Sequence, residues 1–328
     1  MEQRNFKPFG SISSLTLGGG GIGNVWGETS RKEAIETVNL AYESGINHFD
    51  VAPMYGRGEA EKVVGMALKN KPLEEINITT KCRLGNPKDS KVYDVLNDSL
   101  CRSLKTMELE KVNLFLLHSQ LIEDDFCFFK FDETREKSGT TLSCYFNAVI
   151  PAFERLKQEG KIDHWGIGLG QGEALIKAIN YSKPPEAMQC VVNVLNSIGA
   201  IGYVNEKNDP NKILNECQNK NVPILAIRAV QAGALTSSMD RKPHESGFDV
   251  EDFKDFEKAL PFREYAKKVN ENPASLAHRY ALSQEKVSSV ILGVKNRKEL
   301  LECIKAESAG ELDKEMLANL NNLFKNMK

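Results

Sequence analysis

The sequence predicts a (β/α)8 barrel, and two observations support this. Eight short apolar runs recur along the 328 residues, and each is followed by a longer stretch with helical apolar spacing. The short runs show no polar–apolar alternation, as is typical of parallel strands covered on both faces. No Pro/Ser-rich linker or low-complexity stretch interrupts the pattern, so we expect residues 1–328 to form a single barrel domain.

The predicted elements follow one another in strict alternation. The expected strands cover residues 14–18, 46–50, 76–80, 112–117, 163–169, 188–192, 222–227 and 287–293. The expected helices cover residues 31–45, 58–70, 90–107, 146–160, 172–181 and 211–220, a pair spanning about 258–284, and 297–307. Thr29 and Ser30 are typical capping residues for the first helix, and Gly45 and Gly160 are typical residues at helix ends.

Two predicted connections exceed the usual loop length. They cover residues 119–144, after the fourth strand, and about 236–257, after the seventh. Long loops in compact domains commonly act as lids or binding loops. Both follow strands, so we expect both at the C-terminal face of the barrel, where such folds place their active sites. The alternative for each loop is a flexible surface segment that takes no part in binding.

Composition excludes several classes of protein. The 43 basic and 45 acidic residues give a net charge of −2, which offers no electrostatic reason to bind nucleic acid or an anionic membrane. The sequence lacks both an apolar run of about 20 residues and a signal-peptide core, so we expect a soluble cytoplasmic protein. Seven scattered cysteines without a CxxC pair, and five histidines without an HExxH motif, argue against a disulfide framework and a metal site.

Four chemically active side chains fall at the ends of consecutive predicted strands. Asp50 ends the second strand with Tyr55 five residues later, Lys81 ends the third and His118 ends the fourth. Because neighbouring strands lie about 4.8 Å apart, these side chains can meet at one mouth. A nearby ammonium lowers the pKa of a tyrosine from about 10, and a carboxylate holds that ammonium in place. Taken singly, a structural ion pair or a structural histidine is the alternative; His48 we interpret as a core residue.

At these residues the sequence resembles the aldo-keto reductases. The similarity runs in order along almost the whole chain. Its segments are INHFDVAPMYGRGEAEKVVGMAL (46–68), TTKC (79–82), LLHS (116–119), QEGKIDHWGIG (158–168), QCVVNVLN (189–196) and ILGVKNRKELLE (291–302). The resemblance implies that Tyr55 is the general acid/base, that Lys81 lowers its pKa, that Asp50 positions Lys81, and that His118 orients a substrate carbonyl. It also implies hydride exchange with a nicotinamide cofactor.

The cofactor site is predicted from two glycine-containing segments. Residues 18–23 (GGGGIG) match the dinucleotide-binding pattern GxGxxG. We expect no helix directly after them and no acidic residue about 20 positions on, so the rest of that motif is missing. Gly19 and Gly20 are therefore expected only to let the backbone approach a nicotinamide closely. The segment from Gly293 leads into a helix start, where free N–H groups can hold phosphate. Lys295 and Arg297 add charge there, and the resemblance favours NADP(H), with NAD(H) as the alternative.

Several positions depart from the common pattern of the family. Gly168 and Leu169 replace a Ser-Asn pair that holds the nicotinamide amide, although Gln189 can still contact it. Ile227 replaces a stacking tyrosine. Arg228 is expected to contact the pyrophosphate, and the turn 231–236, which includes Gly233 and Leu235, is expected to close over it. Near the adenine the family commonly has a Glu-Asn pair, of which this sequence keeps only Glu302.

The expected substrate is a small carbonyl compound or a sugar. Its pocket is predicted from Trp26, Met54, Tyr55 and His118, with the four phenylalanines of the first long loop, Phe126, Phe128, Phe129 and Phe131. Alternatives are an aldose 1-dehydrogenase working in the oxidative direction, a cofactor-binding regulatory barrel subunit, and an aldolase-type enzyme using Lys81 as a Schiff-base lysine. The sequence carries no prediction of oligomeric state.

Overall fold

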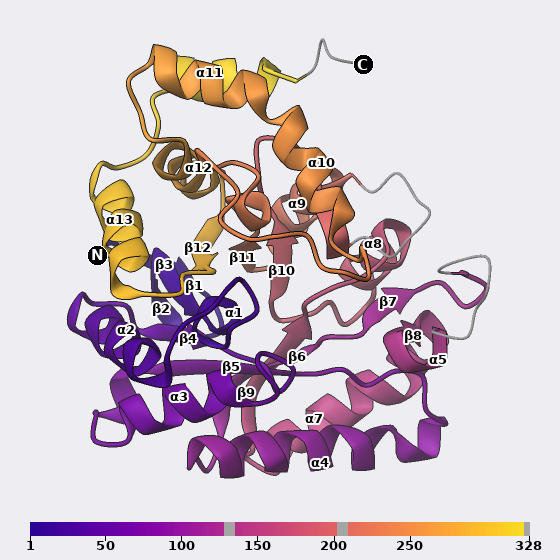
Figure 1. Cartoon of the computed structure of the whole chain (residues 1–328). Helices are drawn as coiled ribbons and strands as arrows, with labels where there is room; N and C mark the ends of the chain where they lie inside the picture. The colour runs from indigo at the N-terminus through magenta and orange to yellow at the C-terminus, as the bar shows by residue number, and fades with distance from the viewer. Residues whose placement is uncertain (128–134, 202–208, 325–328) are drawn as a thin grey trace.

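Eight parallel strands close into a barrel in this computed structural model, which describes residues 1–127, 135–201 and 209–324 (Figure 1). Neighbours in the barrel follow chain order, and the last strand pairs with the first. The strands are β3 (Leu15–Gly18), β4 (His48–Asp50), β5 (Asn77–Cys82), β6 (Val112–Leu117), β9 (Ile162–Ile167), β10 (Met188–Val191), β11 (Ile224–Ile227) and β12 (Val287–Leu292). Each overlaps one predicted run, so the predicted (β/α)8 fold is confirmed.

Helices surround the barrel, and the predicted ones all form (Figure 1). They are α2 (Arg31–Glu43), α3 (Glu59–Leu68), α4 (Asp89–Met107), α7 (Ile150–Gln158), α8 (Gly172–Ile179), α9 (Pro210–Lys220), α11 (Leu260–Lys268), α12 (Pro273–Leu282) and α13 (Arg297–Ser308). Ser30 caps α2 as expected, because its side chain accepts a hydrogen bond from the Glu33 backbone N–H.

An N-terminal hairpin that the sequence analysis missed packs against the barrel interior. Its strands, β1 (Gln3–Phe6) and β2 (Gly10–Ser13), pair antiparallel. Phe6 and Ile12 are fully buried and pack in one cluster with Leu114 and Leu225 of the barrel strands. Each strand has only four residues, too few for a clear periodic pattern, which explains why the sequence did not reveal it.

His48 is a core residue, as predicted. It is fully buried, its Nδ1 lies 2.8 Å from Thr16 Oγ1, and its Nε2 lies 2.7 Å from Thr79 Oγ1. Burial, assisted by the charge of Lys81, lowers its pKa to about 3. A neutral imidazole therefore links the barrel strands from the inside.

Both long connections contain regular structure, so treating them as loops was wrong in part. Residues 119–144 hold β7 (Gln120–Ile122) paired with β8 (Gly139–Thr141), besides the short helices α5 (Arg135–Ser138) and α6 (Leu142–Cys144). The second connection ends in α10 (Val250–Lys258), and α14 (Lys314–Asn322) near the C-terminus was also missed. α10 carries mostly charged residues and two of its aspartates, Asp252 and Asp255, are buried, so the sequence offers no reason to place this stretch against the barrel.

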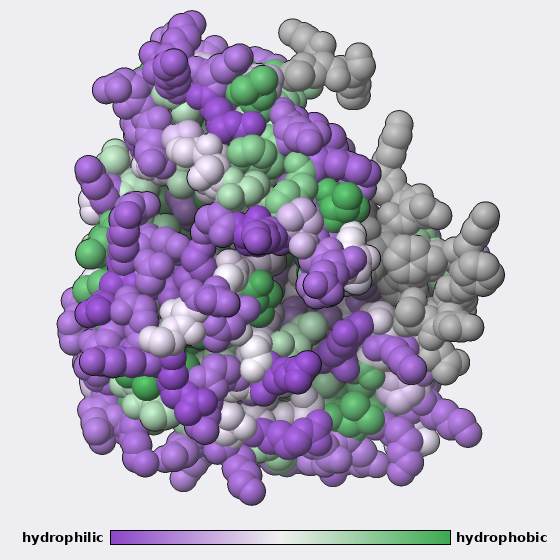
Figure 2. Space-filling view, in the orientation of Figure 1, coloured by the Kyte–Doolittle hydropathy of each residue, from purple (hydrophilic) through white to green (hydrophobic). Residues whose placement is uncertain are grey.

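The outer surface is largely polar. In Figure 2 hydrophilic residues cover most of the visible face, with small separated hydrophobic spots, while the main apolar cluster is buried between strands and helices. Across the described ranges, no helix combines the length and the apolar character needed to cross a bilayer.

We predict that Phe6→Ala lowers the free energy of unfolding by about 3–5 kcal/mol, because it opens a cavity where the hairpin meets the barrel. Chemical denaturation followed by circular dichroism measures this. The matched control is Phe248→Ala, whose side chain lies on the surface with 53% exposed and whose loss we expect to cost less than about 0.5 kcal/mol. Equal effects of the two variants would show that the hairpin contributes little to stability.

Candidate active site

The structure brings Asp50, Tyr55, Lys81 and His118 together at the C-terminal ends of their strands. Lys81 Nζ lies 2.5 Å from Asp50 Oδ1 and 3.4 Å from the Tyr55 hydroxyl. The rings of Tyr55 and His118 meet edge to face with their centroids 5.8 Å apart. The convergence expected from the strand ends is therefore present.

The backbone fixes Lys81 between its partners. On β5, Thr79 pairs with Asp50 of β4, and Lys81 lies two residues further along the same face. Its fully buried ammonium donates to Asp50, to the carbonyl oxygen of Val51 at 3.0 Å, and to Tyr55. The three N–H donors thus match three acceptors. Because Lys81 donates to the Tyr55 oxygen, the phenol proton of Tyr55 remains for another acceptor.

Burial and charge act against each other at these groups. Burial disfavours the charge of Lys81, but Asp50 and Tyr55 outweigh burial and raise its pKa. Burial also raises the pKa of Tyr55 above the ordinary 10.0, and Lys81 opposes this only in part. Lys81 therefore lowers the pKa of Tyr55, as expected, while burial raises it by more. Burial, then Lys81 and Arg83, hold the pKa of His118 well below its usual value, so its imidazole is neutral.

Gln189 is tied directly to this group. Its Nε2 donates to Asp50 Oδ2 at 2.7 Å, a contact that the sequence analysis did not foresee. A side chain at Gly168 would begin 3.4 Å from Gln189 Oε1 and 3.6 Å from a carbon of the His118 ring. Gly168 therefore leaves space between these two side chains. Gly168, Leu169, Gln189 and Ile227 line one pocket, so the departures from the family pattern gather in one place.

The glycines after β3 themselves form a short helix, α1 (Gly19–Ile22). As expected, no helix opens directly after residues 18–23, because within the described residues 1–127 the next one, α2, begins at Arg31. Gly20 and Gly293 lie beneath the indole of Trp26, since a β-carbon at either would approach it to 2.5 Å and 3.1 Å. Trp26 thus covers the ends of β3 and β12, next to the predicted cofactor glycines. Met54, beside Tyr55, is 47% exposed.

The basic segment after β12 is already paired with carboxylates. Lys295 Nζ contacts Asp240 and lies 3.1 Å from Glu299, and Arg297 lies 2.9 Å from Glu33. The backbone N–H of Lys295 donates to Glu299, and that of Arg297 donates to Glu33. The expectation of free N–H groups at these two positions was therefore wrong, and a phosphate there must compete with carboxylates.

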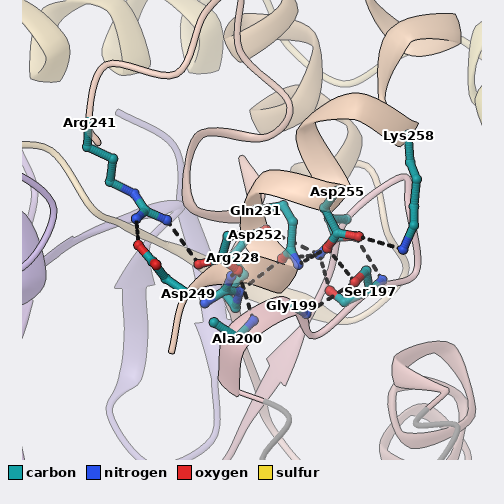
Figure 3. Close-up of polar contacts among 11 residues, drawn as sticks. Ser197, Gly199, Ala200, Arg228, Gln231, Arg241, Asp249, Asp252, Asp255 and Lys258 are labelled. Carbon is teal, nitrogen blue, oxygen red and sulfur yellow. Dashed lines mark hydrogen bonds and ion pairs between the residues drawn. The ribbon is translucent and has the colours of Figure 1, made fainter. Parts of the chain in front are cut away.

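Arg228 belongs to a buried charged network (Figure 3). Its side chain is only 7% exposed; it contacts Asp252 of α10 and donates to Gln231 Oε1 at 2.9 Å. Asp252 also accepts from Arg241 at 3.1 Å. In this arrangement the guanidinium expected at the pyrophosphate is held by a carboxylate from the missed helix.

The same network holds a strained turn. Arg228, Gln231 and Ala232 have φ values of 57°, 46° and 50°, in the left-handed region that side chains rarely adopt. Asp255 of α10 accepts from Gln231 at 2.8 Å and from Ser197 at 2.5 Å (Figure 3). The turn carries two predicted cofactor residues: Gly233 has a φ of 96°, and Leu235 is fully buried.

The remaining predicted residues lie further out. Glu302 is on the exposed side of α13. Phe126 is half-buried and packs against Ile122. Phe128, Phe129 and Phe131 fall outside the described residues.

We predict that Asp252→Ala lowers the free energy of unfolding by about 3–5 kcal/mol, because it leaves the buried Arg228 guanidinium without its carboxylate. Chemical denaturation measures the loss. Glu251→Ala on the same helix is the control: its side chain is 48% exposed and pairs with Lys254, so we expect a loss below about 1 kcal/mol. A loss of that small size for Asp252→Ala would contradict the importance of the network.

Comparison with known proteins agrees with the geometry. An uncharacterized oxidoreductase YqkF of Bacillus subtilis is 27% identical, with 94% of each chain covered. L-galactose dehydrogenase of Arabidopsis thaliana is 25% identical over 97% of this chain and 92% of its own. The solved aldo-keto reductase AKR11C1 of Bacillus halodurans has the same fold, with a TM-score of 0.70 at 20% identity over 98% and 96% of the chains. The family model for the Aldo/keto reductase family matches residues 14–325, so the chain belongs to this family of NAD(P)H-dependent oxidoreductases.

Proposed function

We propose that the protein interconverts a carbonyl compound and an alcohol with NADP(H), using Tyr55 as general acid and base. The contact that supports this most directly is the one between the Tyr55 hydroxyl and Lys81 Nζ at 3.4 Å. The ammonium stabilises a developing phenolate, and the phenol proton is free to move to a substrate oxygen.

The other side chains prepare this proton transfer. Asp50 keeps Lys81 protonated, so the positive charge stays beside Tyr55. Neutral His118, edge-on to Tyr55, can donate a ring N–H to the same substrate oxygen and orient it. Charged Lys81 is a poor nucleophile, which argues against the Schiff-base alternative.

The side chains at the mouth suit a nicotinamide cofactor, which supplies or accepts a hydride when bound. Gln189 Oε1 faces the space over Gly168, where it can accept from an amide N–H. We assign the remaining cofactor contacts to Gly19, Gly20, Asp50, Arg228, Gly233, Leu235, Gly293, Lys295, Arg297 and Glu302. Lys295 and Arg297 are the phosphate-binding candidates that favour NADP(H), in competition with their acidic partners; NAD(H) is the alternative.

The substrate contacts are Trp26, Met54, Tyr55 and His118. A sugar substrate is the second candidate, because one relative that covers 97% of this chain is an L-galactose dehydrogenase. The corresponding reaction oxidises a sugar at its anomeric hydroxyl, with Tyr55 accepting the proton. We place the reaction in the cytoplasm, without a nucleic acid or membrane partner.

We predict that Tyr55→Phe lowers kcat by about 10²–10⁴-fold, because the proton donor is lost. Calorimetric titration should show unchanged NADPH affinity. The control is Tyr181→Phe, an exposed tyrosine stacked on Phe146, with activity expected near wild type. Full activity of Tyr55→Phe on aldehydes and aldoses would overturn the proposal, whereas an inactive wild type that binds NADPH would favour a regulatory subunit.

We also predict that Tyr55 ionises above pH 10.0 in the free protein, because burial raises its pKa. The ultraviolet absorbance of phenolate, as wild type minus Tyr55→Phe across a pH titration, measures this. Carbonyl reduction should stay flat between about pH 6 and 9, since Tyr55 remains protonated and His118 remains neutral throughout. An inflection near pH 6.5 would show that His118 titrates instead.

A further inference from the structure

The carboxylate of Asp50 has a different partner on each oxygen. Oδ1 accepts from Lys81 Nζ at 2.5 Å, and Oδ2 accepts from Gln189 Nε2 at 2.7 Å. Asp50 is 2% exposed and Gln189 is 7% exposed, so water cannot readily replace either donor. The carboxylate is therefore fixed from β5 on one side and from β10 on the other.

The chemistry of the pair decides how the amide is oriented. An ionised carboxylate only accepts hydrogen bonds, so Gln189 must present its NH2 group to Asp50. Its carbonyl oxygen then lies on the side of Gly168, at 3.4 Å from the β-carbon position there. Neither Gly168 nor Leu169 has a side-chain donor that could hold Asp50 in place of Gln189.

We propose that Gln189 is a positioning residue for proton transfer at Tyr55, because its amide holds the Asp50 carboxylate in the orientation that pairs with Lys81. The inference rests on the proposed role of Tyr55. It assigns to Gln189 a task beyond cofactor contact, since the amide belongs to a chain of contacts from Gln189 through Asp50 and Lys81 to Tyr55.

The consequence of losing Gln189 follows from the balance of charge. Burial raises the pKa of Asp50, and Lys81 and Gln189 oppose this. Without the amide, a proton moves more readily from Lys81 to Asp50, and the pair becomes neutral. Tyr55 then loses the positive charge that stabilises its phenolate. Three other titratable groups interact with Lys81: His48, His118 and the buried Glu61. Both histidines are neutral, Glu61 cannot carry a positive charge, and Arg83 acts on His118, so none of them replaces the charge of Lys81.

The first test is Gln189→Met, which keeps side-chain length but removes the donor. We expect Tyr55 to ionise about one pH unit higher in the free protein, measured as phenolate absorbance against the double variant with Tyr55→Phe. We expect kcat for alcohol oxidation at a fixed pH to fall roughly tenfold, in line with the smaller phenolate fraction. The matched control is Gln120→Met, since Gln120 is 6% exposed, lines the same pocket, and donates to Ile201 instead of Asp50.

The second test is Gln189→Glu, which distinguishes positioning from packing. Two adjacent carboxyl groups share a proton, so Glu at this position can donate to Asp50 at low pH and repels it once ionised. We expect oxidation by this variant to fall at high pH, where the wild-type rate still rises. A purely structural role would lower the rate equally at every pH.

The proposal is overturned if Tyr55 titrates at the same pH in Gln189→Met, Gln120→Met and wild type, or if the rate of Gln189→Glu falls equally at every pH. The pH titration of Tyr55 requires no catalytic turnover. It therefore tests the effect of the Gln189 contact even when no carbonyl substrate reacts. An inactive wild type with a shifted Tyr55 titration in Gln189→Met would reject the proposed reaction and keep the positioning role.

Discussion

The buried ion pair between Asp50 and Lys81 is the interaction on which the site depends. Neither charge has access to bulk water, so each is stable only while the other stays within contact. Closure of the barrel supplies that constraint, because β4 and β5 pair in a fixed register that brings the two side chains to one end. Gln189, from a strand on the far side of the barrel, completes the solvation that water would otherwise provide.

A second group of buried charges organises the long connection after β11. Arg228 and Arg241 share Asp252, and Asp249 and Asp255 bind the neighbouring segments (Figure 3). These side chains attach α10 to the turns after β10 and β11 at the mouth. The ion pair between Lys295 and Asp240 joins the same connection to the segment after β12. The mouth is therefore covered by contacts between charged side chains, which ionic ligands can compete for.

The sequence was sufficient to predict the barrel, because its strands are continuous apolar runs and its helices have clear apolar faces. It also predicted the meeting of Asp50, Tyr55, Lys81 and His118, because consecutive parallel strands end on one side. It did not predict α10, which buries Asp252 and Asp255 in polar contacts instead of apolar side chains, or the short N-terminal strands. The pairing of Arg297 with Glu33 was equally invisible, since 264 positions separate the two residues.

The placement of Trp26 has a spectroscopic consequence. The chain has two tryptophans, and Trp165 is fully buried against Phe153, away from solvent and from the mouth. Trp26 is partly exposed, lies over Gly20 and Gly293, and has the Arg241 guanidinium 6.0 Å from its ring. Intrinsic fluorescence therefore divides into a constant contribution from the core and a variable one from the mouth. Removing Trp165 would leave a single tryptophan, whose emission reports on the entrance to the barrel.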